Sequence, residues 1–258
     1  MKNVAVNFSA EMKRVVEFVD LITALFGMAK TPLTSLRCKR FLAESIKDVH
    51  ARTRALKLGD SLALEGVYLS SCALFEQAVR DLIDAAAFQI VGKKPVFSDL
   101  PGSMQKSHLQ GCIDILKKKQ DKFSHLTPQI VITSMASCYR ASTTGSYTII
   151  SEALSSHAHN FRSEELKTCI GRLGVQDLWR RLGSEIALQN LFGGTSPTDT
   201  MNFSKTRLDA IMQQRNQTMH RSPSFAPPAA KDVKECAGFL DALTESLANV
   251  LVSHVSNI

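Results

Sequence analysis

Apolar residues recur along most of this chain at intervals of three and four positions, the spacing that places them on one face of an α-helix. The first such segment, about Ala10–Gly27, has Ser9 as its N-cap and an apolar stripe opposite most of its charged side chains. The alternation with period two that marks half-buried strands is nearly absent, and no internal repeat is visible. The pattern therefore predicts a mostly or wholly α-helical fold.

The strongest helical segment is Asp60–Val91, which Gly92 is well placed to end. Its broad apolar face comprises Leu64, Val67, Leu74, Phe75, Ala78, Val79, Leu82 and Ile83. Small residues at positions 70–73 predict close packing against another helix. Glu76 and Arg80 are spaced i, i+4, and that spacing alone predicts a surface ion pair of small energy.

Shorter helices and loops are predicted for the rest of the chain. A helix over about Ser35–Lys57 carries a basic run, which is typical of a solvated face and is a weaker candidate for RNA contact. The segment Thr127–Ala141 has β-branched residues, yet a short helix is favoured over a strand. The other predicted helices cover about Ser103–Phe123, Ile149–Ser155, Ser163–Gly171, Val175–Leu191 and Ala229–Val255, and the predicted connections are Lys93–Gly102, Arg140–Ser146 and Gly193–Thr200.

One stretch, Met201–Pro228, concentrates the candidate chemistry. It predicts an amphipathic helix that stops at a proline-rich turn, and its apolar face comprises Leu208, Ile211, Met212 and Met219. Near its end, Arg215, Asn216 and His220 fall within six residues. A permanently charged guanidinium beside an imidazole that titrates near neutrality suits work on a phosphate. The spacing alone is equally explained by two cations that complement the dipole at a helix C-terminus.

Length and charge narrow the class of protein. A chain of 258 residues can form one large or two small domains with a buried core. The net charge of +7 and the pI near 9.2 favour an anionic partner, most simply nucleic acid. No apolar run is long enough to span a membrane and no secretory signal is visible, so we expect a cytoplasmic protein without a membrane partner.

Metal and nucleotide motifs are weak or missing. The six cysteines are scattered, which argues against a zinc site and against a disulfide framework. His157 and His159 form an H-x-H pair that can ligate a metal, but no carboxylate or cysteine cluster accompanies it. The sequence lacks the P-loop pattern, the G-x-S-x-G pattern of serine hydrolases and the H-E-x-x-H pattern of zinc proteases, so none of these functions is predicted. We expect no metal and no cofactor.

With the helices placed, the segment RNQTMH resembles the R-x4-H signature of the HEPN superfamily. Ribonuclease members of that superfamily carry an Arg, often a polar residue next to it, and then a His; the matching residues here are Arg215, Asn216 and His220. The motif ends the penultimate predicted helix and a closing helix follows. Upstream, EGVYLSSCALFEQAVRDLIDAAA (Glu65–Ala87) and SSHAHNFRSEELKTCIGRLGV (Ser155–Val175) resemble the RiboL-PSP branch.

The resemblance covers about three quarters of the chain, from Asp60 to Ile258. It implies an all-α, HEPN-like helical bundle with extra helices over residues 59–258. Residues 1–58 are then an N-terminal helical extension, packed on the core or continuous with it.

By resemblance, the protein is a metal-independent endoribonuclease that acts as a homodimer, with the motifs of two protomers in one cleft. His220 would act as base or acid, its mate in the dimer would supply the complementary role, and Arg215 would hold the phosphate. Asn216 would orient His220 or bond a phosphate oxygen, while Glu76 and Arg80 are second candidates. The expected partners are RNA and an antitoxin or sensor protein, as for a toxin or antiphage-defence effector.

Two departures and two alternatives accompany this resemblance. Many members have a glycine directly after the His, whereas this chain has Arg221, which adds positive charge. Members that are silenced by AMPylation carry a tyrosine two residues after the His, and this chain has Ser222 there, so we expect no regulation by that route. The main alternative is a catalytically silent HEPN-like module that dimerises and binds RNA or a protein. The other is a DNA-binding helical protein, for which no recognition-helix pattern is visible.

Overall fold

The computed structural model describes residues 1–30, 51–52, 60–117, 123–140, 146–155, 160–220 and 226–258. Across these residues the chain forms helices and no strand, so the all-α prediction is confirmed. The α-helices are α1 (Lys2–Lys30), α3 (Asp60–Lys93), α4 (Gly102–Lys117), α5 (Pro128–Arg140), α6 (Glu152–Ser155), α7 (Ser163–Gly171), α8 (Leu178–Gly183), α9 (Ile186–Leu191), α10 (Pro197–His220) and α11 (Ala230–Ser256), and the 3-10 helix η2 covers Phe97–Asp99.

Most predicted elements are present, but Ser9 is not the N-cap of the first helix, because α1 begins at Lys2 and the Ser9 hydroxyl donates to Asp241 of α11. The ambiguous segment after residue 127 is helical, as α5. The helix expected over Val175–Leu191 is divided into α8 and α9 by a break at Ser184 and Glu185. Gly183, the last residue of α8, packs closely on the start of α10, since a Cβ atom there would lie 2.2 Å from the carbonyl oxygen of Pro197. The helix expected over Ser35–Lys57 lies almost wholly outside the described residues.

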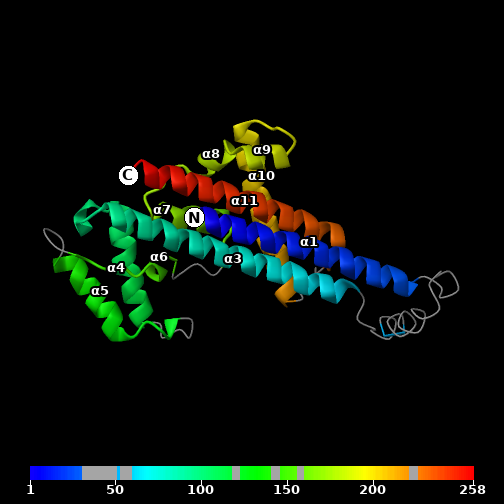
Figure 1. Cartoon of the computed structure of the whole chain (residues 1–258), viewed down its shortest axis with the longest axis horizontal. Coiled ribbons are helices and arrows are strands. Elements are labelled where there is room, and N and C mark those ends of the chain that lie inside the picture. Colours follow the sequence, from blue (N-terminus) through cyan, green and yellow to red (C-terminus); the bar gives the residue numbers. More distant parts are fainter. Residues whose placement is uncertain (31–50, 53–59, 118–122, 141–145, 156–159, 221–225) are drawn as a thin grey trace.

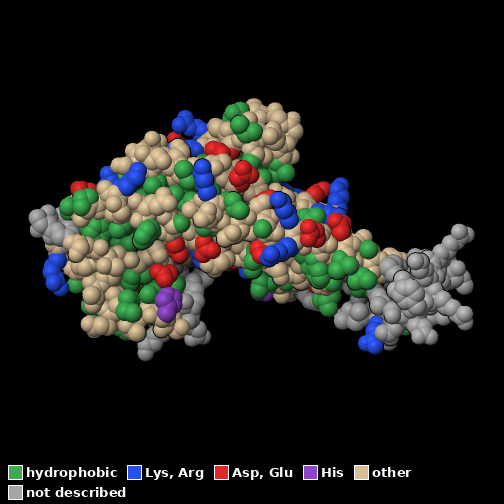
Figure 2. Space-filling view, in the orientation of Figure 1, with side chains coloured by type: hydrophobic (Ala, Val, Ile, Leu, Met, Phe, Trp, Pro, Cys, Tyr) green, Lys and Arg blue, Asp and Glu red, His purple; other side chains and the backbone are tan. Residues whose placement is uncertain are grey.

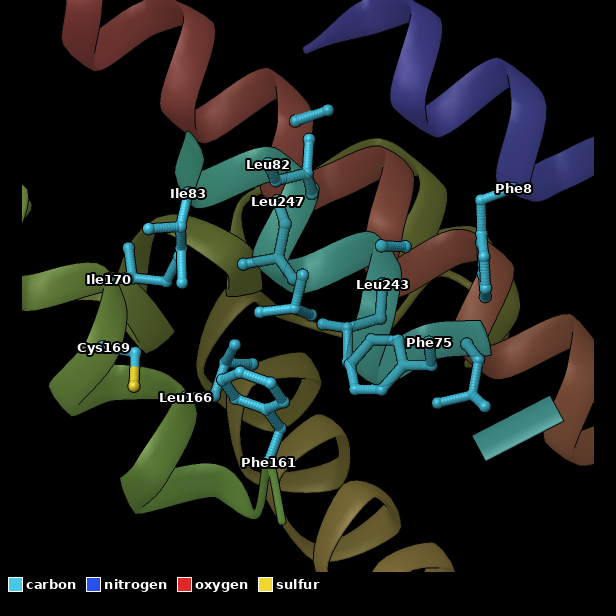
Figure 3. Packing of buried hydrophobic residues seen from close by; sticks show 14 of the residues in the cluster. Phe8, Phe75, Leu82, Ile83, Phe161, Leu166, Cys169, Ile170, Leu243 and Leu247 are labelled. Carbon is cyan, nitrogen blue, oxygen red and sulfur yellow. The ribbon is translucent and has the colours of Figure 1, made fainter. Parts of the chain in front are cut away.

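Three long helices, α1, α3 and α11, lie side by side along the longest axis of the molecule (Figure 1). Their apolar faces meet in one core, where Figure 3 shows Phe75 and Leu82 of α3 next to Leu243 and Leu247 of α11. Phe8 of α1 packs edge-on against Phe75, with ring centroids 6.4 Å apart. All five side chains are at most 5% exposed, so α3 is covered by helices on more than one side.

The N-terminal helix is part of this core. Phe8, Met12, Val19 and Ile22 of α1 are buried in the same apolar cluster as the residues of α3 and α11. The division of the chain into 1–58 and 59–258 remains a prediction. None of the described helices combines the length and apolar character that crossing a bilayer requires. On the face shown in Figure 2, basic and acidic side chains are intermixed over α1 and α11, so the excess positive charge forms no single-sign field there.

Helices α4, α5 and α6 form an arm that projects from one end of α3 (Figure 1). Cys112, Ile115 and Val131 belong to a second apolar cluster inside this arm. Gly111 brings α4 directly onto the backbone of α6, because a Cβ atom at this position would lie 2.1 Å from the carbonyl oxygen of Ala153. The arm thus has a small core of its own, beside that of the main bundle.

Candidate active site

The C-terminal end of α10 carries three of the predicted site residues. Leu208 and Ile211 are almost completely buried, which fixes the rotation of α10 about its axis. Arg215 consequently lies on the side that faces α3, whereas His220, about 140° further round, is exposed. The prediction that Met219 joins the buried face is wrong: its side chain is 52% exposed, because the described helices do not cover that side of the last turn.

Two oxygen acceptors hold the guanidinium of Arg215. Its Nη1 atom donates a hydrogen bond to Oδ1 of Asn216 at 3.0 Å. Its Nη2 atom lies 3.8 Å from Oε1 of Glu76 on α3, and the Arg215 side chain is 20% exposed. Asn216 therefore orients Arg215, and among the described residues no hydrogen bond joins Asn216 to His220.

Glu76 lies between two arginines. Its Oε2 atom is 3.9 Å from Nη2 of Arg80, and its Oε1 atom is the one that faces Arg215. The ion pair predicted from the i, i+4 spacing is therefore present, but it is largely buried because α3 runs through the bundle; the Glu76 side chain is only 9% exposed. Burial raises the pKa of Glu76, and the guanidinium groups of Arg215 and Arg80 oppose that shift.

Arg80 continues the line of polar groups along α3. Its guanidinium carbon lies 5.4 Å from the centroid of the Phe161 ring, which is fully buried, so the charge rests over an aromatic face. Asp84 follows one turn later. Glu76, Arg80 and Asp84 are spaced i, i+4, i+8 on one face of the helix and are called the α3 polar row below.

A layer of phenol and thiol groups underlies the arginines. The hydroxyl of Tyr68 donates to the carbonyl oxygen of Ile211 at 3.2 Å and so ties α3 to α10. Cys72 is completely buried one turn before Glu76, and a hydrogen bond with Cys236, followed by burial, raises the pKa of Cys72. A raised pKa keeps the thiol protonated and unreactive. This layer therefore positions α10 and supplies no nucleophile.

A second network fixes α10 from its other side. The carboxylate of Asp209 accepts hydrogen bonds from both the backbone N–H and the hydroxyl of Ser163, each at 2.7 Å. The carbonyl oxygen of Ser163 in turn accepts from Nε1 of Trp179 at 3.0 Å. These bonds dock α7 and α8 onto the helix that carries the motif, two turns before Arg215.

The structure brings together four predicted site residues, Arg215, Asn216, Glu76 and Arg80. His220 stands apart from them on the exposed side of α10, and no described residue forms a hydrogen bond or ion pair with it. Arg221 lies outside the described residues, as do His157 and His159.

The sequence reasoning missed Asp84, Phe161 and Asp209. Asp84 could have been found from the sequence, because it continues the four-residue spacing of Glu76 and Arg80 by one more helical turn. Phe161 and Asp209 had none, since their roles depend on contacts between segments far apart in the chain. The described part contains no group of three or more His, Cys, Asp or Glu side chains placed to hold a metal ion.

The protein is an α-helical bundle with two candidate groups near the C-terminal end of α10. One is the partly exposed guanidinium of Arg215, which Asn216 and Glu76 hold in place, and the other is the exposed imidazole of His220. The comparison with known protein families identifies the class of this bundle. Residues 44–253 match the family model RiboL-PSP-HEPN, and the chain belongs to this family. The match begins after α1 and includes Glu76, Arg215 and His220.

Neither the curated proteins nor the solved structures include a match to this chain. The family model therefore supplies the relationship, and it confirms the resemblance that RNQTMH and the α3 segment suggested. HEPN is a family of RNases, and its domains typically dimerise and bind RNA.

Proposed function

We propose that this protein is a metal-independent endoribonuclease. In this reaction the ribose 2′-hydroxyl attacks the adjacent phosphate and expels the 5′-oxygen, giving a 2′,3′-cyclic phosphate and a 5′-hydroxyl. The single observation that carries the proposal is the state of Arg215, whose guanidinium is held by Asn216 and Glu76 while 20% of the side chain stays exposed.

Arg215 binds the scissile phosphate and stabilises the charge that develops on the phosphorane. A guanidinium presents paired N–H donors that match two phosphate oxygens. Because Asn216 and Glu76 already fix the group, little reorganisation is needed as charge builds up, and such preorganised charge is the largest source of catalysis in many enzymes.

His220 transfers the protons. An imidazole can take the 2′-hydroxyl proton or protonate the leaving oxygen. Arg215 and His220 lie on different sides of α10 in one chain, so we propose that two protomers form a composite site. The His220 of one protomer then acts as base and that of its mate as acid.

The remaining predicted residues support these two. Glu76 positions Arg215, since its carboxylate forms an ion pair with that guanidinium at 3.8 Å. Arg80 and Arg221 add positive charge for neighbouring phosphates, in line with the net charge of +7. An enzyme that cuts cellular RNA must be restrained, so we place this one in the cytoplasm as a toxin or antiphage-defence effector controlled by an antitoxin or a sensor protein.

A catalytically silent module that binds RNA or a protein is the second candidate. It is favoured by one observation: His220 makes no described contact with Arg215, so the two catalytic groups of one chain do not converge. In that case the arginines would bind a phosphate without cleaving its ester bond.

A synthetic RNA with a single cleavable nucleotide separates the two candidates. The protein is incubated in excess EDTA with this RNA and with a version that lacks only the 2′-hydroxyl at that nucleotide. Our proposal predicts cleavage of the first RNA, with a cyclic phosphate end, and none of the second. Binding of both RNAs without any cleavage, across a range of substrate sequences, would identify the silent module instead.

A further inference from the structure

The α3 polar row contains two carboxyl groups that the described structure leaves incompletely bonded. Oε1 of Glu76 and Oδ1 of Asp84 are both buried, and neither has a hydrogen-bond partner among the described residues. A buried oxygen without a donor is far more costly when it belongs to a carboxylate than when the carboxyl is neutral. The geometry therefore favours the protonated form of Asp84, whereas at Glu76 the guanidinium groups of Arg215 and Arg80 oppose that preference.

The surroundings of Asp84 strengthen this preference. On α3 it has one cationic neighbour, Arg80, and one anionic neighbour, Asp81. It also meets Ser151, which lies just before α6 and hydrogen-bonds to it, and the anionic Glu152, the first residue of α6. Burial is the main cause that raises the pKa of Asp84 to about 6, and Glu152 and Asp81 add to the rise.

A further titratable group reaches Asp84 only through Glu152. Nε2 of His125 lies 3.0 Å from Oε1 of Glu152, and the His125 side chain is 58% exposed. Its charge can therefore offset that of Glu152, but it makes no direct contact with Asp84. Neither Arg215 nor Asn216 is among the groups that influence Asp84, so this residue can be altered without touching the proposed catalytic arginine.

We infer that Asp84 is a proton-operated control of phosphate binding, whose ionised carboxylate competes with RNA for the positive charge of Arg80 and whose protonation releases that charge to the substrate. The inference rests on the proposed function, since it assigns a regulation to that site. With all groups ionised, Glu76, Arg80, Asp84 and Arg215 carry no net charge together. Protonation of Asp84 leaves one net positive charge next to the bound phosphate.

The size of the effect follows from the charge that is removed. A like charge within several ångströms of a partly buried phosphate weakens its binding by about five- to tenfold. Binding and protonation are linked, so RNA that prefers the protonated form also promotes proton uptake by the protein. The site should therefore bind RNA more tightly as the pH falls through about 6, the pKa of Asp84.

RNA affinity as a function of pH tests this inference. The probe is a fluorescein-labelled 2′-O-methyl RNA oligonucleotide, which cannot be cleaved through its 2′-oxygen. The full chain carries His220→Ala, so that the His220 side chain contributes nothing, and anisotropy gives the Kd from pH 5 to pH 8 at one ionic strength. We expect the Kd to fall about five- to tenfold towards pH 5.

Two further variants test whether the carboxyl group of Asp84 causes the pH dependence of the Kd. Asp84→Asn should bind as tightly at pH 7.5 as its parent does at pH 5 and should lose most of the pH dependence. Asp81→Asn, which neutralises an exposed acid on the same helix, should keep the size of the pH-dependent change and move its midpoint to a slightly lower pH, because Asp81 contributes to the raised pKa of Asp84. Equal slopes in the parent and Asp84→Asn, or equal flattening by Asp81→Asn, would overturn the inference.

The same data separate the inference from the proposed function. RNA binding that responds to Asp84→Asn while the protein with His220 intact never cleaves RNA contradicts only the nuclease. No binding of RNA at any pH overturns both. Thermal melting at pH 7.5 checks that Asp84→Asn is folded, and Asp84→Ser serves as the replacement if the amide is not accommodated.

Discussion

The arm and the main bundle each bury a titratable side chain, His108 in the arm and Glu76 in the bundle, and the two side chains differ in how completely they are hydrogen-bonded. His108 in the arm is completely buried. Its Nε2 accepts a hydrogen bond from the backbone N–H of Ile150 at 3.0 Å, and Ser134 and Cys112 approach it at 3.4 Å. In the bundle, by contrast, Glu76 has two long ion pairs and one oxygen without a described hydrogen bond.

The difference separates a structural centre from the one that we propose to be functional. Burial lowers the pKa of His108 to about 4, so the ring is neutral at physiological pH and its hydrogen bonds join α4 to α5 and to the segment before α6. The α3 polar row leaves one carboxyl oxygen of Glu76 and one of Asp84 without a described hydrogen bond, and part of Arg215 remains open to solvent. Unsatisfied charge beside an accessible guanidinium is the arrangement expected where a ligand completes the network.

Replacing Arg215 by Ala has the largest expected effect on activity. It removes the guanidinium that faces the phosphate, and we expect kcat/KM for RNA cleavage to fall about a thousandfold. Arg207→Ala is the matched control, because Arg207 lies on the same helix and pairs on the surface with Glu235 at 3.2 Å. Equal losses in both variants would mean that the effect is not specific to Arg215.

Replacing His108 by Leu should instead destabilise the arm. The change removes the acceptor for Ile150 N–H and leaves that buried donor unpaired, at a cost of about 3 kcal/mol in the free energy of unfolding. Cleavage per folded molecule should be unchanged. Denaturant unfolding and cleavage rates are measured on the same preparation, and a stable but inactive variant would contradict the distinction between the two centres.

Much of the fold could be predicted from the sequence because it depends on local periodicity. Helix α7 has the predicted bounds, and the long helix α3 extends only two residues beyond the predicted end at Val91. The break between α8 and α9 at Ser184 and Glu185 could not be foreseen, because the apolar spacing predicts one continuous helix across these residues.

The candidate site was predictable in its residue types and less so in its geometry. The Arg–Asn–His motif and the i, i+4 pair on α3 could be read directly. That Asn216 bonds to Arg215 rather than to His220, and that Asp209 fixes α10 through Ser163, depends on side-chain directions that spacing does not determine.

Acidification should destabilise the wild type through His108. The folded-state pKa of about 4 lies below the usual value near 6.5, so the unfolded chain takes up the proton first. The stability from neutral His108 is complete above pH about 6.5, falls as the pH drops towards 4, and amounts to about 3 kcal/mol. Urea unfolding at pH 4.5 and 7.5 should show this loss in the wild type and not in His108→Leu.

Glu76→Gln should affect turnover and binding in opposite directions. The amide removes the negative charge beside Arg215, so RNA should bind more tightly, while the guanidinium loses its ionic anchor and kcat should fall about tenfold. Steady-state cleavage kinetics give both constants. A parallel rise in KM would argue that Glu76 contacts RNA directly and does not position Arg215.

Asp84→Asn should have the smallest effect on stability, and it should be favourable. The folded-state pKa of about 6 lies above the usual value for Asp, so the ionised group destabilises the fold at pH 7.5. We expect the unfolding free energy to rise by about 1 kcal/mol after allowance for solvent screening. This gain should shrink as the pH falls from 6 towards 4, and a loss of stability at pH 7.5 would show that the carboxylate is satisfied.

Incubation of the purified protein with total RNA in excess EDTA tests the central claim most directly. The wild type, Arg215→Ala and His220→Ala are compared side by side, and the product ends are analysed. We predict cleavage by the wild type alone, with 2′,3′-cyclic phosphate ends. Cleavage that persists in both variants, or that EDTA abolishes, would contradict a metal-independent site built on Arg215 and His220.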